Sequence, residues 1–241
     1  MFGLASSLPF DPVAEQNRIA GLVRLAPLDD TPTFVVGVDA AYVGTDGDTA
    51  APGGGIGIGA AVVIDTANLK VVEAVTVRVE VSVGYEPGLL AFREAPVVLA
   101  AIDRLKHSPK FVACDGHGIA HPHRAGLASH VGVELGVPTL GCAKQLFVGE
   151  HGSVGNERGS TTPIIDDGEL LGAVVRTQTG VNPVFVSPGH LIDVDSSVHL
   201  LLTLAGKYRL PETTRAADQL VRQESKIVAA QYSQGDKSDG R

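Results

Sequence analysis

The sequence lacks a long hydrophobic run, a secretion signal and a cysteine framework. No apolar stretch reaches the about 18 to 20 residues that a membrane helix needs, and the N-terminus does not combine basic, apolar and small residues as a signal sequence does. The two cysteines, Cys114 and Cys142, each lie in an apolar run. These absences predict a cytoplasmic protein without a membrane segment, whose thiols are buried and reduced, with a disulfide as the less favoured alternative.

Positive charge is also scarce. The chain has 19 Lys and Arg against 27 Asp and Glu, which gives a formal net charge of -8. A surface that binds phosphate without specificity is usually basic, so this balance argues against one. An enzyme that acts on nucleic acid stays open, because carboxylates that hold divalent cations count as negative charge until the metal binds.

What is present suits one large α/β domain. The chain has 241 residues, of which 44% are hydrophobic, enough for a substantial core. We expect a single domain over residues 1–232 and a disordered polar tail over residues 233–241. The apolar spacing predicts these elements: a helix at 11–25; strands at 33–42, 55–65 and 70–80 forming an antiparallel meander; a helix from about 89 to 106; a strand at 111–114; a helix at about 124–135; a strand at 138–142; a loop at 149–163; strands at 169–177 and 182–190; and helices at about 194–206, capped by Asp193, and about 212–232.

Several charged side chains interrupt or end these apolar runs. Asp39 lies inside the strand at 33–42, where burying an unpaired carboxylate would cost several kcal/mol, so it needs a cation, a metal or a donor network. Asp115 ends the strand at 111–114, and ligands gather at the carboxyl ends of strands in open α/β sheets. The alternative for Asp115 is an ordinary Asp-Gly turn. Glu94 lies in the first turns of its helix, where an acid is commonplace and, without partners, structural.

If the strands of Asp39 and Asp115 are neighbours, their carboxylates converge and cannot all be ionised without a cation. Mg²⁺ takes one or two carboxylates together with water and substrate phosphate. Lys144, which follows the strand at 138–142, would then offset charge on a scissile phosphate. His190, after V-S-P-G, would bind or relay a proton.

Three histidines, His117, His121 and His123, follow Asp115 at spacings of four and two residues. A structural zinc site would want a fourth cysteine or histidine ligand, but the nearest thiol, Cys114, belongs to the buried strand. We therefore favour a position for one of these histidines near a phosphate or a metal-bound water rather than a zinc site.

Five segments together resemble the motifs of the endonuclease V family, in the family's order. They are G-V-D-A-A-Y (37–42), Y-E-P-G-L-L-A-F-R-E (85–94), D-G-H-G-I-A-H-P-H-R-A-G-L-A-S-H-V-G (115–132), P-T-L-G-C-A-K (138–144) and V-S-P-G-H (186–190). The resemblance implies a ribonuclease H-like α/β fold, in which a mixed five-stranded sheet flanked by helices presents carboxylates to Mg²⁺, with Mn²⁺ as a substitute. It also implies recognition of deaminated adenine (inosine) in nucleic acid and hydrolysis of the second phosphodiester bond on its 3′ side, leaving 3′-hydroxyl and 5′-phosphate ends. We expect a monomer that acts on deoxyinosine in DNA.

The resemblance also implies roles for particular residues. Asp39, Glu94 and Asp115 match the metal-binding acids, and Lys144, His121 and His190 match catalytic-site positions of the G-x-x-K, H-P-x-R and S-P-G-H motifs. Tyr85 matches the aromatic residue of a wedge that the family usually writes Pro-Tyr-Ile-Pro, but Gly84 and Glu86 replace its first proline and its isoleucine. The wedge is thus looser and carries a negative charge. His117 takes the place of a residue that is more often glutamine.

A nuclease of this kind would flip the modified base into a pocket and read its edge through backbone groups near Gly116, Gly118 and Gly141. Phosphate contacts are expected from Arg93, Arg124, Lys144 and Lys207, and with 5% aromatic residues, stacking is limited. Two rival functions remain: a related nuclease for inosine in RNA, mismatches or flaps, and a nucleic-acid-binding protein without catalysis. The intact acids and Lys144 argue against the second.

Overall fold

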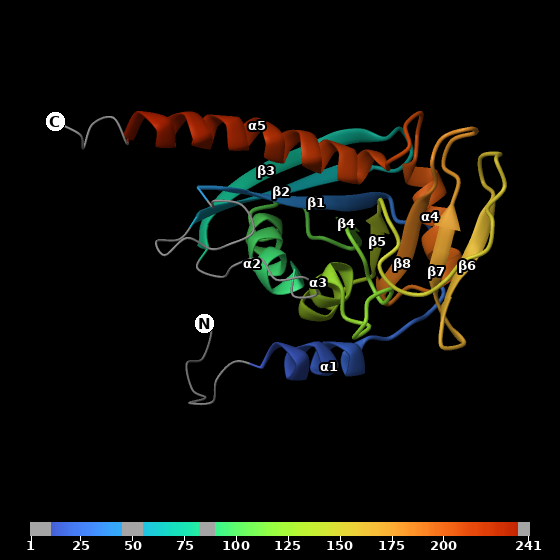
Figure 1. Ribbon diagram of the computed structural model, residues 1–241. Coiled ribbons are helices and arrows are strands. Elements are labelled where there is room, and N and C mark those ends of the chain that lie inside the picture. The colour runs from blue at the N-terminus through green and yellow to red at the C-terminus, as the bar shows by residue number, and fades with distance from the viewer. Residues whose placement is uncertain (1–10, 45–54, 82–89, 236–241) are drawn as a thin grey trace.

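The computed structural model describes residues 11–44, 55–81 and 90–235 of the chain. Its strands are β1 (Phe34–Val43), β2 (Gly55–Asp65), β3 (Lys70–Val81), β4 (Val112–Asp115), β5 (Thr139–Ala143), β6 (Thr161–Asp166), β7 (Glu169–Val175) and β8 (Val184–His190). They form one mixed sheet in the order β3-β2-β1-β4-β5-β8-β7-β6 (Figure 1). The first five strands in this order, β3, β2, β1, β4 and β5, correspond to the five-stranded sheet that the family resemblance implied. The other three strands, β8, β7 and β6, extend it with antiparallel pairing.

The helices are α1 (Pro12–Leu22), α2 (Leu90–Ile102), α3 (Leu127–Leu135), α4 (Val194–Leu204) and α5 (Glu212–Gly235). None of the helices in the described residues is long and apolar enough to cross a membrane. The predicted cap of α4 is confirmed, because the Asp193 side chain accepts a hydrogen bond from the Ser196 N–H at 2.8 Å. α3 begins later than expected because Arg124 has a positive φ of 54° and Gly126 is the N-cap. α5 continues three residues past its predicted end at 232.

The antiparallel meander of β1, β2 and β3 is confirmed with boundaries within about two residues of those predicted. The prediction of a loop over 149–163 was wrong at its end, because β6 begins at Thr161 and pairs with β7. Pro163 lies within β6, and the sheet order places β6 at an edge, where a proline's missing N–H does not interrupt a ladder. The proline made this segment resemble a loop, so β6 was not predicted.

Helices cover both faces of the sheet. Val36, Val38 and Val63 pack with α2 and α3 in one core cluster, whereas Val35, Phe111 and Ala113 pack with α4 in another. α5 lies on the second face, with Ala217 packed against Val62 and Ile64 of β2 (Figure 1).

Side chains alternate between faces along a strand, so Asp39 shares the face of Val35, and Asp115 shares the face of Phe111 and Ala113. The fold therefore places both acids on the face that α5 and α4 cover.

Candidate active site

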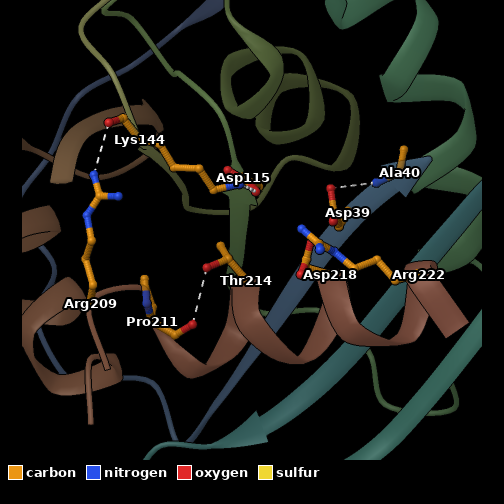
Figure 2. A network of polar contacts seen from close by, with 9 residues as sticks. All are labelled: Asp39, Ala40, Asp115, Lys144, Arg209, Pro211, Thr214, Asp218 and Arg222. Atoms are coloured by element: carbon orange, nitrogen blue, oxygen red, sulfur yellow. Dashed lines mark hydrogen bonds and ion pairs between the residues drawn. The ribbon is translucent and has the colours of Figure 1, made fainter. Parts of the chain in front are cut away.

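Asp39 and Asp115 lie next to each other on parallel strands. β1 pairs with β4 with Val38 opposite Cys114, so the next position of each strand carries an acid. The condition on which the sequence-based prediction depended, that the two strands are neighbours, is met. Asp39 Oδ1 accepts a hydrogen bond from the Ala40 N–H at 2.9 Å (Figure 2). Burial, followed by the negative charge of Asp115, nonetheless raises the pKa of Asp39 to about 7.

Glu94 approaches the same two acids from α2. The hydroxyl of Tyr42, near the end of β1, donates to the Arg93 carbonyl at 3.0 Å, and the Arg93 guanidinium lies 3.8 Å above the Tyr42 ring. These contacts fix α2 beside the strand. Burial, and then the charges of Asp39 and Asp115, raise the pKa of Glu94 to about 8.

Glu94 is the fifth residue of α2 as the structure describes it, so it lies in the first turns of the helix, as the sequence predicted.

Lys144 supplies a positive charge to this group of acids. β5 pairs in parallel with β4, with Cys142 opposite Asp115, and Lys144 follows the end of β5. Its Nζ lies 2.6 Å from Asp115 Oδ2 (Figure 2). Burial lowers the pKa of Lys144, but the hydrogen bond and the charge of Asp115 outweigh it and raise the pKa overall. The lysine therefore remains a cation at neutral pH.

Asp218 is a fourth acid that the sequence did not single out. It lies on α5 beside Asp39, and Arg222, one turn later, donates to its Oδ1 at 2.9 Å (Figure 2). The charge of Asp218 helps to raise the pKa of both Asp39 and Lys144. The sequence signal for it is weak. Asp218 stands among Thr214, Ala217 and Val221, which are buried at helical spacing, but charged residues commonly flank the buried stripe of an amphipathic helix.

The histidines divide between two places. His121 is buried in the loop after β4, where its Nδ1 accepts from the His123 N–H at 3.2 Å and its ring centroid lies 5.4 Å from that of Phe147. His117 contacts the same Phe147 ring at 5.6 Å, and its Nε2 lies 3.1 Å from the Gln145 carbonyl oxygen. Burial lowers the pKa of His117.

The structure does not bring His190 to the acids. β8 runs antiparallel to β5, so His190 pairs with Thr139 at the start of β5, whereas Lys144 follows its far end. His190 Nδ1 accepts a hydrogen bond from the Arg24 backbone N–H at 3.3 Å. The strand direction, which the sequence alone did not fix, separates this histidine from Lys144.

Backbone conformation and close backbone packing explain why glycine stands at the three positions predicted to line a base pocket. Gly116 has a φ of 142°, a backbone conformation that residues with a side chain rarely adopt. A Cβ at Gly118 would lie 1.9 Å from the Pro188 carbonyl oxygen, and one at Gly141 would lie 2.6 Å from that of Gly116. The turn after β4 therefore packs directly on β5 and β8. Tyr85, with Gly84 and Glu86, lies outside the described residues.

Two of the expected phosphate ligands are engaged elsewhere. Arg93 is buried over the Tyr42 ring, and Arg124 forms 2.8 Å ion pairs with Asp166 and Glu169. Lys207 is exposed beside the Tyr208 ring.

The donor set fits a hard divalent cation chemically. The four acids, Asp39, Glu94, Asp115 and Asp218, offer oxygen, the ligand atom that Mg²⁺ prefers. Burial and neighbouring negative charge raise the pKa values of Asp39 and Glu94, and a bound cation would lower them. Over residues 11–44, 55–81 and 90–235, no three His, Cys, Asp or Glu side chains lie close enough together as they stand to hold one ion. Lys144 instead neutralises one oxygen of Asp115.

A mixed sheet of this order, with acids on adjacent parallel central strands and helices on both faces, is a ribonuclease H-like fold. The family model described as endonuclease V matches residues 17–219. A relative named endonuclease V from Streptomyces avermitilis is 48% identical over 219 residues, which cover 90% of this chain and 92% of that one. The chain therefore belongs to the endonuclease V family, and it is an endonuclease.

Solved structures agree with this assignment. The crystal structure of the Streptomyces avermitilis endonuclease V has a TM-score of 0.82 at 46% identity and covers 90% of this chain and 92% of that one. The catalytic domain of human endonuclease V has a TM-score of 0.81 at 27% identity, covering 91% of this chain and 96% of that one. A Ciona intestinalis endonuclease V, at 24% identity and a TM-score of 0.76, covers 89% of this chain and 96% of that one and shares the fold; it was solved with a 24mer DNA containing an inosine followed by a ribo-adenosine.

Proposed function

We propose that this endonuclease is a Mg²⁺-dependent repair enzyme that recognises deoxyinosine in DNA and hydrolyses the second phosphodiester bond on its 3′ side. The observation that supports it best is the pair of half-buried acids, Asp39 and Glu94, whose pKa values are raised beside Asp115 and Lys144. Acids held in that condition need a cation to ionise together. Family membership supports the substrate, since a member from Ciona was solved with inosine-containing DNA.

In this proposal Asp39, Glu94 and Asp115 hold Mg²⁺, and Asp218 adds a fourth acid at the edge of the site. The bound metal would supply Lewis acidity toward the scissile phosphate and its attacking water. Lys144 donates to a non-bridging phosphate oxygen and offsets the charge that develops there. Water adds to phosphorus as the bond from phosphorus to the 3′ oxygen breaks, which leaves a 3′-hydroxyl and a 5′-phosphate.

His121 lies in the loop that follows Asp115, so we assign it a place near the substrate phosphate. We give His190 a supporting role at the start of β5, because its partner there is the Arg24 backbone. We propose that the backbone around Gly116, Gly118 and Gly141 reads the flipped base and that Tyr85 is the wedge.

A second candidate substrate is inosine followed by a ribonucleotide, or inosine in RNA. The observation that favours it is the ribo-adenosine after the inosine in the DNA of the Ciona complex. We also propose that the chain acts as a monomer in the cytoplasm, in keeping with two buried free thiols, Cys114 and Cys142. Light scattering should return the mass of one chain, 24.9 kDa, and a dimer mass would overturn the monomer.

Nicking assays test the function directly. Matched duplexes with inosine or adenine, followed by a deoxyribo- or ribonucleotide, are incubated with Mg²⁺, Mn²⁺ or EDTA. We expect a nick only with inosine and metal. Asp115→Asn should lower the nicking rate by about 100-fold or more while leaving binding within a few-fold, and Tyr85→Ala should reduce the preference for inosine over adenine.

Asp103→Asn provides the matched control, because Asp103 is exposed just after α2 and away from the site. It should nick like the parent chain. Equal nicking of inosine and adenine duplexes in Mg²⁺ would refute the proposed specificity, and undiminished nicking by Asp115→Asn would refute the role of the acids. Faster cutting before a ribonucleotide would favour the second candidate.

A further inference from the structure

A groove of about 540 Å³ opens beside Lys144, on the side of β5 that faces β8. It is lined by two cations, Lys144 and Arg209, and by neutral residues: Gln145, Leu146, Asn182, Pro183 and Phe185. None of these described lining residues is acidic. In a chain with a net charge of -8, a groove lined by two positive charges and no acid is a distinct local environment, although one of the two, Lys144, is paired with Asp115 at 2.6 Å.

Arg209 is held in place by backbone carbonyls rather than by an acid. Its Nε donates to the Asn182 carbonyl at 3.0 Å, and its Nη2 donates to those of Pro183 at 2.8 Å and Lys144 at 3.1 Å (Figure 2 shows the last of these). A guanidinium has five N–H donors, and the two on Nη1 have no acceptor among the residues that the structure describes. Within the described part of the chain, no carboxylate forms an ion pair with Arg209.

The segment that carries Arg209 is anchored in turn. The Thr177 hydroxyl donates to the Arg209 carbonyl at 2.6 Å, and the Gln178 amide donates to the Gly206 carbonyl at 2.7 Å. The cation is therefore fixed before any ligand arrives, which reduces the entropy lost on binding. The bond from Arg209 Nη2 to the Lys144 carbonyl joins the α4–α5 connection to the residue that follows β5.

A second hollow on the molecule has the opposite character. It has a volume of about 380 Å³ and is lined in part by Asp29, Asp30 and Asp195, with no lysine or arginine among its described lining residues. A polyanion is repelled there and attracted to the groove of Lys144 and Arg209. Of the arginines expected to bind phosphate, Arg93 and Arg124 are already committed to other contacts.

We infer that Arg209 binds a backbone phosphate of the substrate strand in this groove, next to the phosphate that Lys144 contacts. The inference rests on the proposed function and deepens it, since it assigns the strand's path past the end of β5. A phosphate accepts charge-assisted hydrogen bonds from Nη1 while Nε and Nη2 keep the groove's edge in place. The contact is with phosphate, so it positions the strand without reading its sequence.

Salt-dependent binding tests this contact. Fluorescence anisotropy is measured with an inosine duplex and the matched adenine duplex in Mg²⁺, in the Asp115→Asn chain so that neither is cut. One lost phosphate contact should reduce the slope of log K against log salt by about 0.7 to 0.9. Arg209→Gln should therefore lose about threefold less affinity than its parent between about 50 and about 200 mM salt, and equally for both duplexes.

Arg176→Gln is the matched control. Arg176 also donates to backbone carbonyls, those of Gly155 and Val181, but it does not line the groove. It should leave the slope unchanged. An unchanged slope in Arg209→Gln, or a loss confined to the inosine duplex, would overturn the inference.

Gln145→Glu covers the case in which Arg209→Gln fails to fold, as judged by thermal unfolding. Gln145 is exposed in the groove, so the substitution adds a negative charge and leaves every Arg209 contact intact. It should weaken binding of both duplexes several-fold at low salt, and unchanged affinity would overturn the inference. Failure of the parent chain to nick inosine DNA would instead refute the proposed function, because the salt slope is read on the adenine duplex as well.

Discussion

At the scale of single residues, burial acts in opposite directions on the acids and on one histidine. It raises the pKa of Asp39 and Glu94, where a cation can restore the charged form. It lowers the pKa of His130 to about 4. His130 is 5% exposed, its Nε2 has no hydrogen-bond partner among the described residues, and its ring meets Phe92 edge-on at 5.0 Å. The acids are poised for a ligand, whereas His130 is a neutral core side chain.

His130 should make the protein acid-sensitive. The unfolded chain takes up this proton as the pH falls below about 6.5, and the folded chain does so only near a pKa of about 4. The stability that the neutral histidine contributes is therefore present above about pH 6.5 and is lost as the pH falls to about 4. Between pH 7 and 4, His130→Leu should lose about 3 kcal/mol less of its free energy of unfolding than the parent.

Urea unfolding at a series of pH values measures this difference. His199→Leu, at an exposed histidine of α4, is the control and should keep the parent's pH dependence. Parallel pH profiles for His130→Leu and the parent would contradict the assignment.

At the scale of elements, the site depends on how closely α5 approaches β1. A Cβ at Gly37 would lie 2.3 Å from the carbonyl oxygen of Thr213 in the first turn of α5. Asp39 lies two residues after Gly37 on β1, and Asp218 lies five residues after Thr213 on α5. The glycine therefore sets the distance between two elements that each carry an acid of the site.

Gly37→Ala should push α5 away from the sheet. We expect a loss of about 1–3 kcal/mol in the free energy of unfolding, because the added methyl group meets backbone that cannot rotate aside. The nicking rate should fall as well, since Asp218 moves with α5.

Gly21→Ala is the control, because nothing lies within 4 Å of a Cβ there. Its stability should be unchanged or slightly raised. Denaturant titration and nicking of the two variants side by side make the comparison, and a Gly37→Ala chain as stable as the parent would show that the close approach is not constrained.

At the scale of the whole molecule, the site is linked to global stability. Acids with raised pKa values destabilise the folded chain at neutral and higher pH, because they are partly withdrawn from water and lie close to other acids with too little positive charge. A cation that binds only the folded state would reverse this cost. The energetic cost of the site in the free chain and its proposed affinity for metal thus have the same origin.

Asp39→Asn should show the reversal. The folded pKa of Asp39, about 7, exceeds the ordinary value of 3.8, so this carboxyl lowers stability progressively between about pH 4 and 7 and fully above that. In EDTA at pH 8 the asparagine variant should be more stable than the parent. In Mg²⁺ at a 100-fold excess over its Kd, the parent should gain about 2.7 kcal/mol, or several degrees in Tm, and the variant little or nothing.

Differential scanning calorimetry in the two buffers tests the crossover, with Asp103→Asn as a control that should follow the parent. A Mg²⁺-induced gain in Asp39→Asn equal to that of the parent would remove Asp39 from the proposed metal site.

The sequence by itself determined the elements and most of the chemistry. Apolar runs and helical spacing are local properties, so the meander, the helix capped by Asp193 and the acid at the end of β4 could all be predicted. The motifs identified the family for the same reason, since each is a short contiguous stretch. β6 escaped because Pro163 and its polar neighbours resemble a loop, and only pairing with β7 makes them a strand.

Only the tertiary structure decided which of the candidate residues meet. The parallel pairing of β1 with β4 brings Asp39 beside Asp115, while the antiparallel course of β8 carries His190 to the other end of β5 from Lys144. Asp218 joins the acids because α5 folds back over β1, and Arg209 reaches Lys144 across the chain. Strand direction and helix docking depend on contacts between residues distant in sequence, and no local pattern contains them.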